Sequence, residues 1–416
     1  MERTQVEKDR DIHHPAPVHQ HWLSRNRLLA ANGAFAAYAT ALAVDTGHAD
    51  RTWAIWAAVG YGASTLIIWL TRHRNVPMVV PLLVALGGAL AAPVTWLVTR
   101  VAPTPEVQVI SRSAVLLMQH GTPYLPVMAL FGLPRALGAT GLFADPRIWL
   151  TAVSSVLIWA AFMIAAPHRH CEDCRRGVML STMFIVASPV IAFPLAVGIT
   201  DPPVIAVMFL TLALIARPSG LFRAAVALGV TCAMKATAWP AVPVVTAMLT
   251  ARDGARAAWR FVGATIVTAG VLAVALAPAA LANPYAFVQN TVLFPLGLTK
   301  HKTPAASPLP GHLLALTGPA GHWAAVGLLI AAGLGFAVSL IVRPPADARA
   351  AAWRLAIGLA VMFTLAPATR WGYFVYPIGL AGWLVLTRPP RAAGPGVPGP
   401  GGPVPVAVPV QAGSRA

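Results

Sequence analysis

Four ionisable side chains interrupt stretches that otherwise hold apolar and turn residues, and they are the first candidates for chemistry: Glu106, Asp201, Lys235 and Arg370. A carboxylate can take a proton from a reacting hydroxyl group. Lysine binds a phosphate group as a point charge, and arginine binds it through two parallel hydrogen bonds. The four residue types therefore suit acid–base chemistry beside a phosphate group.

Each of these residues also has an ordinary structural explanation. Glu106 would stabilise the N-terminus of a helix that begins after Pro105. Asp201, followed by two prolines, could cap the next helix. Lys235 could extend from an apolar run to the membrane interface, and Arg370, between aromatic neighbours, could be an interfacial anchor. The sequence leaves both explanations open.

The composition decides what kind of elements must position these residues. The chain has 416 residues, of which 57% are hydrophobic and 10% are charged, and its mean hydropathy is +0.69. A soluble domain is usually about 25% charged, and apolar runs of about 20 residues are typical of transmembrane helices. We therefore expect an all-α polytopic membrane protein.

Twelve apolar runs predict about twelve spans. The second half contains a short pair that shares Pro240 and reads as two half-length helices. The runs cover residues 28–46, 52–71, 76–99, 148–167, 177–197, 203–216, 224–238, 239–251, 261–281, 321–342, 355–368 and 373–387.

The net charge of +17 is explained by topology rather than by nucleic acid. If both termini are cytoplasmic, 21 of the 30 basic residues fall in the inner segments, as the positive-inside rule requires. We expect a cytoplasmic tail at 1–26, a transmembrane domain at 27–390 in the cell membrane, and a Pro/Gly-rich cytoplasmic tail at 391–416. Two long loops, 100–147 and 282–320, then face outside, and the active site faces the same way.

The first long outer loop predicts helices that lie in the membrane interface. On a helix, Gln108 and Arg112 share a polar face, whereas Val107 and Ile110 share an apolar face. Arg112 is therefore a further candidate to bind a phosphate. In the second long loop, Lys300 and Lys302 lie in a Pro- and Gly-rich stretch that predicts an irregular lid over a lipid-linked substrate.

A cluster of possible zinc ligands lies on the inner side: His168, His170, Cys171 and Cys174. Structural zinc sites normally draw their ligands from two separated pairs, whereas these four fall within seven residues. We expect neither a metal nor a cofactor at the outer site, although metal binding by this cluster stays open. No phosphate-binding loop or dinucleotide fingerprint is present in the sequence.

The chain resembles the actinobacterial polytopic membrane glycosyltransferases of family 87, in the GT-C class. The resemblance is spread over residues 100–380 in several short segments. They are Val107 to His120-Gly-Thr-Pro-Tyr-Leu-Pro126 with Met128-Ala-Leu-Phe-Gly-Leu-Pro-Arg135; Gly198-Ile-Thr-Asp201; Met234-Lys-Ala-Thr-Ala-Trp-Pro240; Phe294-Pro-Leu-Gly-Leu298 to Ser307-Pro-Leu-Pro-Gly311; and Ala368-Thr-Arg-Trp-Gly-Tyr373.

This resemblance implies a hexosyltransferase that moves a hexose, often mannose, from a polyprenyl-phosphate donor to a glycan or glycolipid acceptor at the outer face. It places a catalytic acid in the first long outer loop, at Glu106, with Asp201 as the second candidate. The donor phosphate would be held by Lys235 and Arg370, with Arg112, Lys300 and Lys302 nearby. Two features depart from the family: Glu106 replaces the usual Asp, and three spans precede the loop where one is expected.

A multi-pass transporter or lipid flippase is the alternative from another functional class. Such a protein would carry charges at mid-span and an internal repeat. The candidate charges of this chain lie near the predicted outer face instead.

Overall fold

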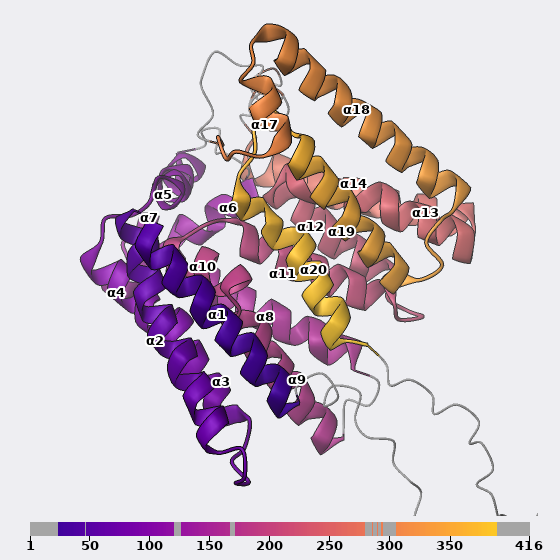
Figure 1. Ribbon diagram of the computed structural model, residues 1–416. Helices are drawn as coiled ribbons and strands as arrows, with labels where there is room; N and C mark the ends of the chain where they lie inside the picture. Colours follow the sequence, from indigo (N-terminus) through magenta and orange to yellow (C-terminus); the bar gives the residue numbers. More distant parts are fainter. Residues whose placement is uncertain are drawn as a thin grey trace, which may run out of the picture.

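The computed structural model describes residues 24–45, 47–119, 126–166, 171–278 and 305–388, with the single residues 285, 289 and 293. The described chain is helical, and its one β-feature is an isolated bridge between Ala306 and Thr369. The expected all-α class is therefore confirmed. The start of α1 and the end of α20 lie in the lower half of Figure 1, away from α5 at the upper left.

The first three apolar runs form an antiparallel group. They are α1 (Arg25–Asp45), α2 (His48–Leu70), and a third helix built of α3 (Val79–Leu86), the π-helical turn η1 (Gly87–Ala91) and α4 (Ala92–Arg100). A π-helical turn leaves a backbone carbonyl without its usual partner. Here the buried indole of Trp53 donates to the Ala89 carbonyl at 2.7 Å, which ties α2 to this turn.

The first long loop, which the sequence predicts to face outside, folds into short helices, as its sequence predicts. They are α5 (Pro105–Met118), α6 (Pro126–Ala129), η2 (Leu130–Gly132), α7 (Leu133–Ala136) and η3 (Gly141–Ala144). Val107 and Ile110 of α5 are buried, whereas Gln108 and Arg112 are exposed. The amphipathic pattern predicted for this helix is therefore present.

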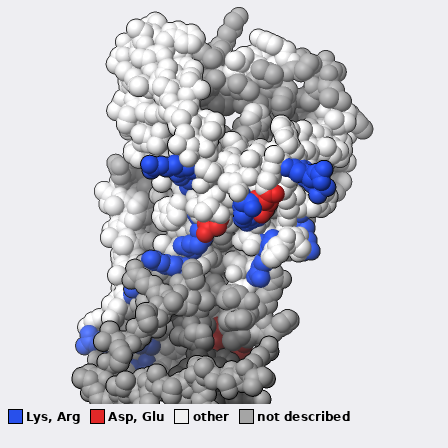
Figure 2. Space-filling view, turned by 90° about the vertical axis from the view of Figure 1, so that its right-hand side faces the viewer, with Lys and Arg blue, Asp and Glu red and all other residues white. Residues whose placement is uncertain are grey.

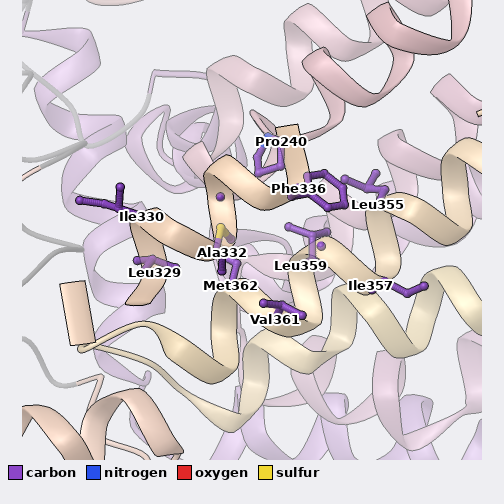
Figure 3. A pocket seen from close by; sticks show the side chains of 12 residues that line it. Pro240, Leu329, Ile330, Ala332, Phe336, Leu355, Ile357, Leu359, Val361 and Met362 are labelled. Carbon is purple, nitrogen blue, oxygen red and sulfur yellow. The ribbon is translucent and has the colours of Figure 1, made fainter. Parts of the chain in front are cut away.

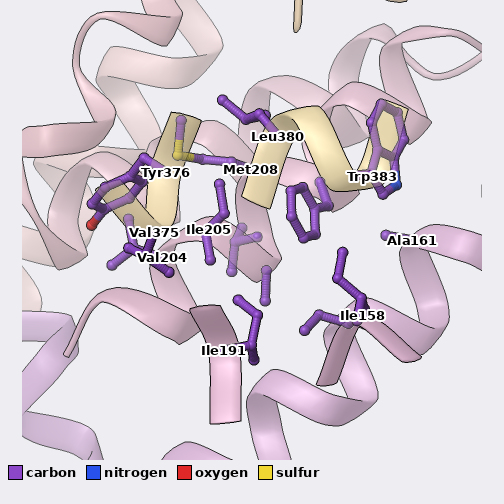
Figure 4. Close-up of a cluster of buried hydrophobic side chains, with 14 of the residues drawn as sticks. Ile158, Ala161, Ile191, Val204, Ile205, Met208, Val375, Tyr376, Leu380 and Trp383 are labelled. Atoms are coloured by element: carbon purple, nitrogen blue, oxygen red, sulfur yellow. The ribbon is translucent and has the colours of Figure 1, made fainter. Parts of the chain in front are cut away.

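The centre of the molecule is α11 (Asp201–Ile215). Nearly all of its residues are buried, which fits a helix that is apolar all round. Figure 4 shows Ile205 and Met208 of α11 between Leu380 of α20 (Val375–Leu386) and Ile158 of α8 (Pro146–Ala165). Among the other helices, α8 and α12 make the most extensive contacts with α11.

The remaining helices surround this centre. They are α9 (Glu172–Ala187), α10 (Pro189–Val197), α12 (Leu221–Met234), η4 (Ala236–Ala238), α13 (Ala241–Asp253), α14 (Ala255–Leu276), α17 (Pro310–Ala315), α18 (Pro319–Val342), α19 (Ala348–Leu365) and η6 (Trp371–Phe374).

Each of the twelve apolar runs coincides with a helix, and these helices differ in length. Within the described residues, seven helices are long and apolar enough to cross a membrane, or eight if the α9–α10 pair, bent by 58°, is one span. Helix α11 has 15 residues, about 22 Å, which is shorter than the roughly 30 Å hydrocarbon core. The predicted half-length pair is found as α12 and α13, with the break at 235–240.

Candidate active site

Glu106 and Arg370 meet although they lie far apart in the sequence. Glu106 is in the first turn of α5, and Arg370 precedes η6 in the turn after α19. An Arg370 guanidinium nitrogen is 2.5 Å from Glu106 Oε1. The other carboxylate oxygen, Oε2, accepts from the backbone N–H of Thr200 at 3.2 Å and from its hydroxyl at 3.4 Å. Glu106 is thus held from two sides.

Lys235 and Asp201 form a second ion pair that shares Thr200 with the first. The Lys235 ammonium donates to the Thr200 hydroxyl at 3.0 Å and to Asp201 Oδ1 at 2.6 Å. Asp201 Oδ1 also accepts from the Tyr376 hydroxyl at 2.6 Å, which in turn accepts from the Thr237 hydroxyl at 2.8 Å. One hydrogen-bonded network therefore links α5, α11, the α12–α13 break and the start of α20.

The turn that supplies Thr200 and Asp201 requires a glycine. Gly198 ends α10 with φ +87°, a left-handed conformation that glycine adopts without strain. A Cβ at this position would lie 2.2 Å from Val107 Cγ2 of α5 and 2.9 Å from Arg147 Cγ. The absence of a side chain here lets the turn pack directly beneath the first turn of α5.

Arg147 is itself locked in place by a buried ion pair. Its guanidinium lies 2.8 Å from Asp145, and its side chain is 1% exposed. Asp145 also accepts from the Arg147 backbone N–H at the start of α8. This pair supports the floor of the turn and does not enter the network around Thr200.

Asp201, one candidate to cap α11, is the first residue of that helix, and Thr200 holds the N-cap position. The Oδ1 oxygen of Asp201 accepts from the side chains of Lys235 and Tyr376. The interfacial explanation of Lys235 also differs from the observed geometry. The Lys235 ammonium is paired with a carboxylate and lies 5.6 Å from the ring centre of Tyr373.

The two ion pairs differ in exposure. Asp201 and Lys235 side chains are 2% and 13% exposed, whereas those of Glu106 and Arg370 are 27% and 33% exposed. A substrate can therefore reach Glu106 and Arg370 more readily than Asp201. The network contains two carboxylates and two cations, so it is balanced in charge until a charged ligand enters.

The turn that carries Arg370 is paired with a segment of the second long loop. The Ser307 backbone N–H donates to Thr369 O at 3.0 Å, Thr369 N–H donates to Ala305 O at 3.1 Å, and Trp371 N–H donates to the Ser307 hydroxyl at 3.0 Å. Gly311 permits this approach, because a Cβ there would lie 2.0 Å from the Leu365 carbonyl oxygen. The loop thus holds the backbone on both sides of Arg370.

Not all predicted residues join the network. The Arg112 side chain is exposed on α5 and makes no hydrogen bond or ion pair within the described chain. Lys300 and Lys302 lie outside the described residues, as do His168 and His170. Cys171 is exposed and Cys174 is buried, and the described residues contain no group of three or more potential metal ligands.

Sequence reasoning missed Thr200, Tyr376 and Thr237. Thr200 directly precedes Asp201 in the turn between α10 and α11, so its place next to a candidate acid was a usable signal. Tyr376 and Thr237 are ordinary residues for an apolar helix and a loop, and nothing in their local sequence indicates that they meet Asp201.

Two apolar grooves flank the α12–α13 break. The larger, about 550 Å³, lies between α18 and α19 beside Pro240, and Figure 3 shows Phe336, Leu359 and Met362 in its wall. The smaller, about 360 Å³, lies against α14 and includes Cys232 and Trp239. Both grooves are therefore lined by the segment that presents Lys235.

No family model and no curated protein matches this chain. Among solved structures it is similar to the crystal structure of ArnT from Cupriavidus metallidurans bound to undecaprenyl phosphate, with 18% sequence identity and a TM-score of 0.49. The similarity covers 74% of this chain, and it spans 59% of the length of that protein.

Proposed function

We propose that this chain is a membrane glycosyltransferase of the GT-C class. It moves a hexose, with mannose as the first candidate, from a polyprenyl-phosphate donor to a glycan or glycolipid hydroxyl at the outer face. One observation carries this proposal: Glu106, Arg370, Lys235 and Asp201 form two ion pairs that meet at Thr200. The family resemblance of the sequence supplies the substrate class.

The donor phosphate binds between Arg370 and Lys235 in this proposal. Within the described chain, Arg370 makes its side-chain hydrogen bond through one terminal nitrogen, to Glu106. A phosphate replaces the carboxylate as the partner of this guanidinium, because the planar fork of arginine suits phosphate oxygens. Lys235 stabilises the charge that develops on the leaving phosphate.

Displacement from Arg370 leaves Glu106 available as the general base. Its carboxylate takes the proton of the acceptor hydroxyl while the oxygen attacks the anomeric carbon of the sugar. The bond from that carbon to the phosphate oxygen breaks, and the electron pair leaves with polyprenyl phosphate. Thr200 continues to donate to Glu106 and so orients the carboxylate.

Asp201 serves as a positioning residue in this scheme. Its side chain is 2% exposed and already accepts from both Lys235 and Tyr376. A carboxylate so enclosed has little access to a sugar hydroxyl. It keeps the Lys235 ammonium beside Thr200, where the leaving phosphate needs it.

The prenyl chain of the donor fits the larger apolar groove. Figure 3 shows Ala332 and Phe336 of α18 beside Met362 and Leu359 of α19, with Pro240 close to Phe336. Pro240 follows Lys235 across the helix break. A lipid tail in this groove would lead its phosphate toward Lys235.

A transfer assay with membranes that contain the protein tests this function. Polyprenyl-phosphate mannose labelled in the sugar is supplied, and the label is followed into acceptor material in the presence of a chelator. We expect label in the product and release of unlabelled polyprenyl phosphate. If the labelled lipid only changes leaflet and stays intact, the transferase proposal is wrong and a flippase is the better description.

A bent pair of helices is the structural observation that favours the flippase alternative. Helices α9 and α10 are bent by 58° at Ser188, and discontinuous helices also form the substrate sites of transporters. Dithionite quenching of a fluorescent donor lipid in proteoliposomes reports leaflet exchange directly and needs no acceptor.

A further inference from the structure

The break between α9 and α10 frees a backbone carbonyl, and a side chain from a distant helix binds it. Helix α9 ends at Ala187, and Pro189 begins α10 after a bend of 58° at Ser188. In a continuous helix the Ile191 N–H would donate to the Ala187 carbonyl, but here it donates to the Ser188 carbonyl at 3.0 Å. The Tyr61 hydroxyl donates to the Ala187 carbonyl instead. A buried carbonyl without a donor is costly, so Tyr61 stabilises the bent arrangement.

Tyr61 belongs to the helical hairpin of α1 and α2, and it precedes Ala187 by 126 positions. Its side chain is fully buried. The Tyr61 ring lies 5.4 Å from the ring of Phe35 in α1, which lies 5.9 Å from the ring of Phe184 in α9. These aromatic contacts hold the hydroxyl at the break. The hairpin therefore reaches the α9–α10 break with a buried and well-packed donor.

A second residue of α2 contacts α10 farther along that helix. The Trp53 ring lies 4.9 Å from the ring of Phe193, and Trp53 is fully buried. The indole is also fixed from the other side, because its N–H donates to the Ala89 carbonyl of η1. Gly60 lets α2 lie directly against η1, since a Cβ at Gly60 would be 2.6 Å from Gly88 Cα. Helix α2 therefore contacts the break before α10 and, again, the middle of α10.

Helix α10 connects this break to the turn of the candidate active site. It has nine residues, about 13 Å, and its last residue, Val197, directly precedes Gly198. The Val197 carbonyl accepts from the hydroxyl of Thr104, the N-cap residue of α5, at 3.1 Å. The end of α10 thus contacts both segments that hold Glu106. They are the start of α5, which carries Glu106, and the turn in which the Thr200 N–H donates to it.

We propose that the hairpin of α1 and α2 positions the turn at 198–201 through α10, with Tyr61 as the main positioning residue. Loss of the Tyr61 hydroxyl shifts the start of α10, and so short a helix passes the shift on to Thr200. The hydrogen bond from Thr200 to Glu106 then lengthens, so the carboxylate is no longer aimed at the acceptor hydroxyl. The effect on transfer rests on the proposed function, whereas the positioning of the turn does not. A tyrosine that only filled the core would change stability and leave the turn as it is.

The test compares two tyrosine variants of the purified full-length protein. Tyr61→Phe removes the hydroxyl and keeps the ring. Tyr38→Phe is the matched control, because Tyr38 lies on the same hairpin and is 48% exposed. Figure 2 shows Lys and Arg side chains in a band across one side of the molecule, and such cations orient membrane helices. Both variants leave every charge unchanged, so they preserve the orientation of the helices.

Hydrogen exchange, followed by mass spectrometry, measures how firmly the turn at 198–201 is held, and it needs no substrate. Single-turnover transfer and the Kd for the donor are measured in parallel. We expect Tyr61→Phe to speed exchange of the turn severalfold, while α14 exchanges as in the wild type. We also expect transfer to slow by roughly tenfold with an unchanged donor Kd. Tyr38→Phe should match the wild type in all three measurements.

Thr104→Val tests the other end of α10 and keeps the test decisive if Tyr61→Phe does not fold. It removes the hydroxyl that binds Val197, and no side-chain capping hydrogen bond of α5 is lost with it. It should speed exchange of the turn and slow transfer in the same way, and Thr104→Ser should restore both. Wild-type exchange of the turn in Tyr61→Phe, or equal acceleration in all helices, would overturn the proposal. If the wild-type protein transfers no sugar, the proposed function fails, and the exchange measurement still decides whether the hairpin positions the turn.

Discussion

Glu106 and Arg370 are separated by 264 positions in the chain, yet their side chains lie 2.5 Å apart. The pair joins the first turn of α5 to the turn between α19 and α20. Both residues are about one-third exposed or less, so a ligand that reaches one must compete with the other. This competition underlies the proposed mechanism and several of the predictions.

Arg370→Lys should raise the KM for the lipid donor by roughly tenfold or more, because lysine retains the charge and loses the planar fork. Steady-state assays with varied donor concentration measure this change. Arg135→Lys is the matched control, since Arg135 is exposed on α7, in the loop that also carries Glu106. If Arg370→Lys keeps the wild-type KM for the donor, the planar fork of Arg370 does not contribute to donor binding.

Asp201→Asn should destabilise the protein by about 3–5 kcal/mol, because it leaves the Lys235 ammonium largely buried without its carboxylate. Thermal unfolding in detergent, followed by circular dichroism, measures the effect. The double variant Asp201→Asn with Lys235→Met should recover much of the stability while remaining inactive. If Asp201→Asn unfolds at the wild-type temperature, the buried pair does not stabilise the fold.

Ser307→Ala should lower kcat by roughly threefold to tenfold with little change in unfolding temperature. The Ser307 hydroxyl accepts from the Trp371 N–H, next to Arg370, so its loss loosens the turn that aims the guanidinium. Ser307→Thr keeps the hydroxyl and should restore kcat. If kcat falls in both variants, the segment tolerates no change of side chain at this position. Ser307 would then have a packing role and would not position Arg370.

Ala332→Leu should raise the KM for a long-chain donor severalfold, because the added atoms narrow the groove between α18 and α19. A donor analogue with a chain of only two isoprene units should be unaffected. Ala331→Leu is the control, since Ala331 is exposed on the same helix and does not line the groove. Equal effects on the long and short donors would place the prenyl chain elsewhere.

The positions of the helices could be predicted from the apolar runs, because a membrane demands long apolar segments whatever the tertiary packing. The number of full membrane spans could not be predicted from these runs. Helix α11 is as apolar as a span but too short for one, and it is enclosed by neighbouring helices rather than by lipid. Hydropathy measures only the preference to leave water, and it does not distinguish these two surroundings.

The sequence also singled out Glu106, Asp201, Lys235 and Arg370, because charge is rare in this chain. It could not predict which acid pairs with which base. That choice depends on the left-handed turn at Gly198, which brings Thr200 under α5 and directs Asp201 toward Lys235. The contribution of Tyr376 follows from the packing of α20 against α11, and it has no local signal.

The central claim is that Glu106 takes the proton of the acceptor hydroxyl. Glu106→Gln keeps the size of the side chain and its ability to accept from Thr200, and Glu106→Asp introduces the acid usual in the resembling family. Single-turnover transfer from labelled polyprenyl-phosphate mannose, with donor binding measured in parallel, tests this claim most directly. We predict that Glu106→Gln binds the donor and transfers the sugar at least about a hundredfold more slowly, whereas Glu106→Asp retains measurable activity. Wild-type transfer by Glu106→Gln would contradict the claim.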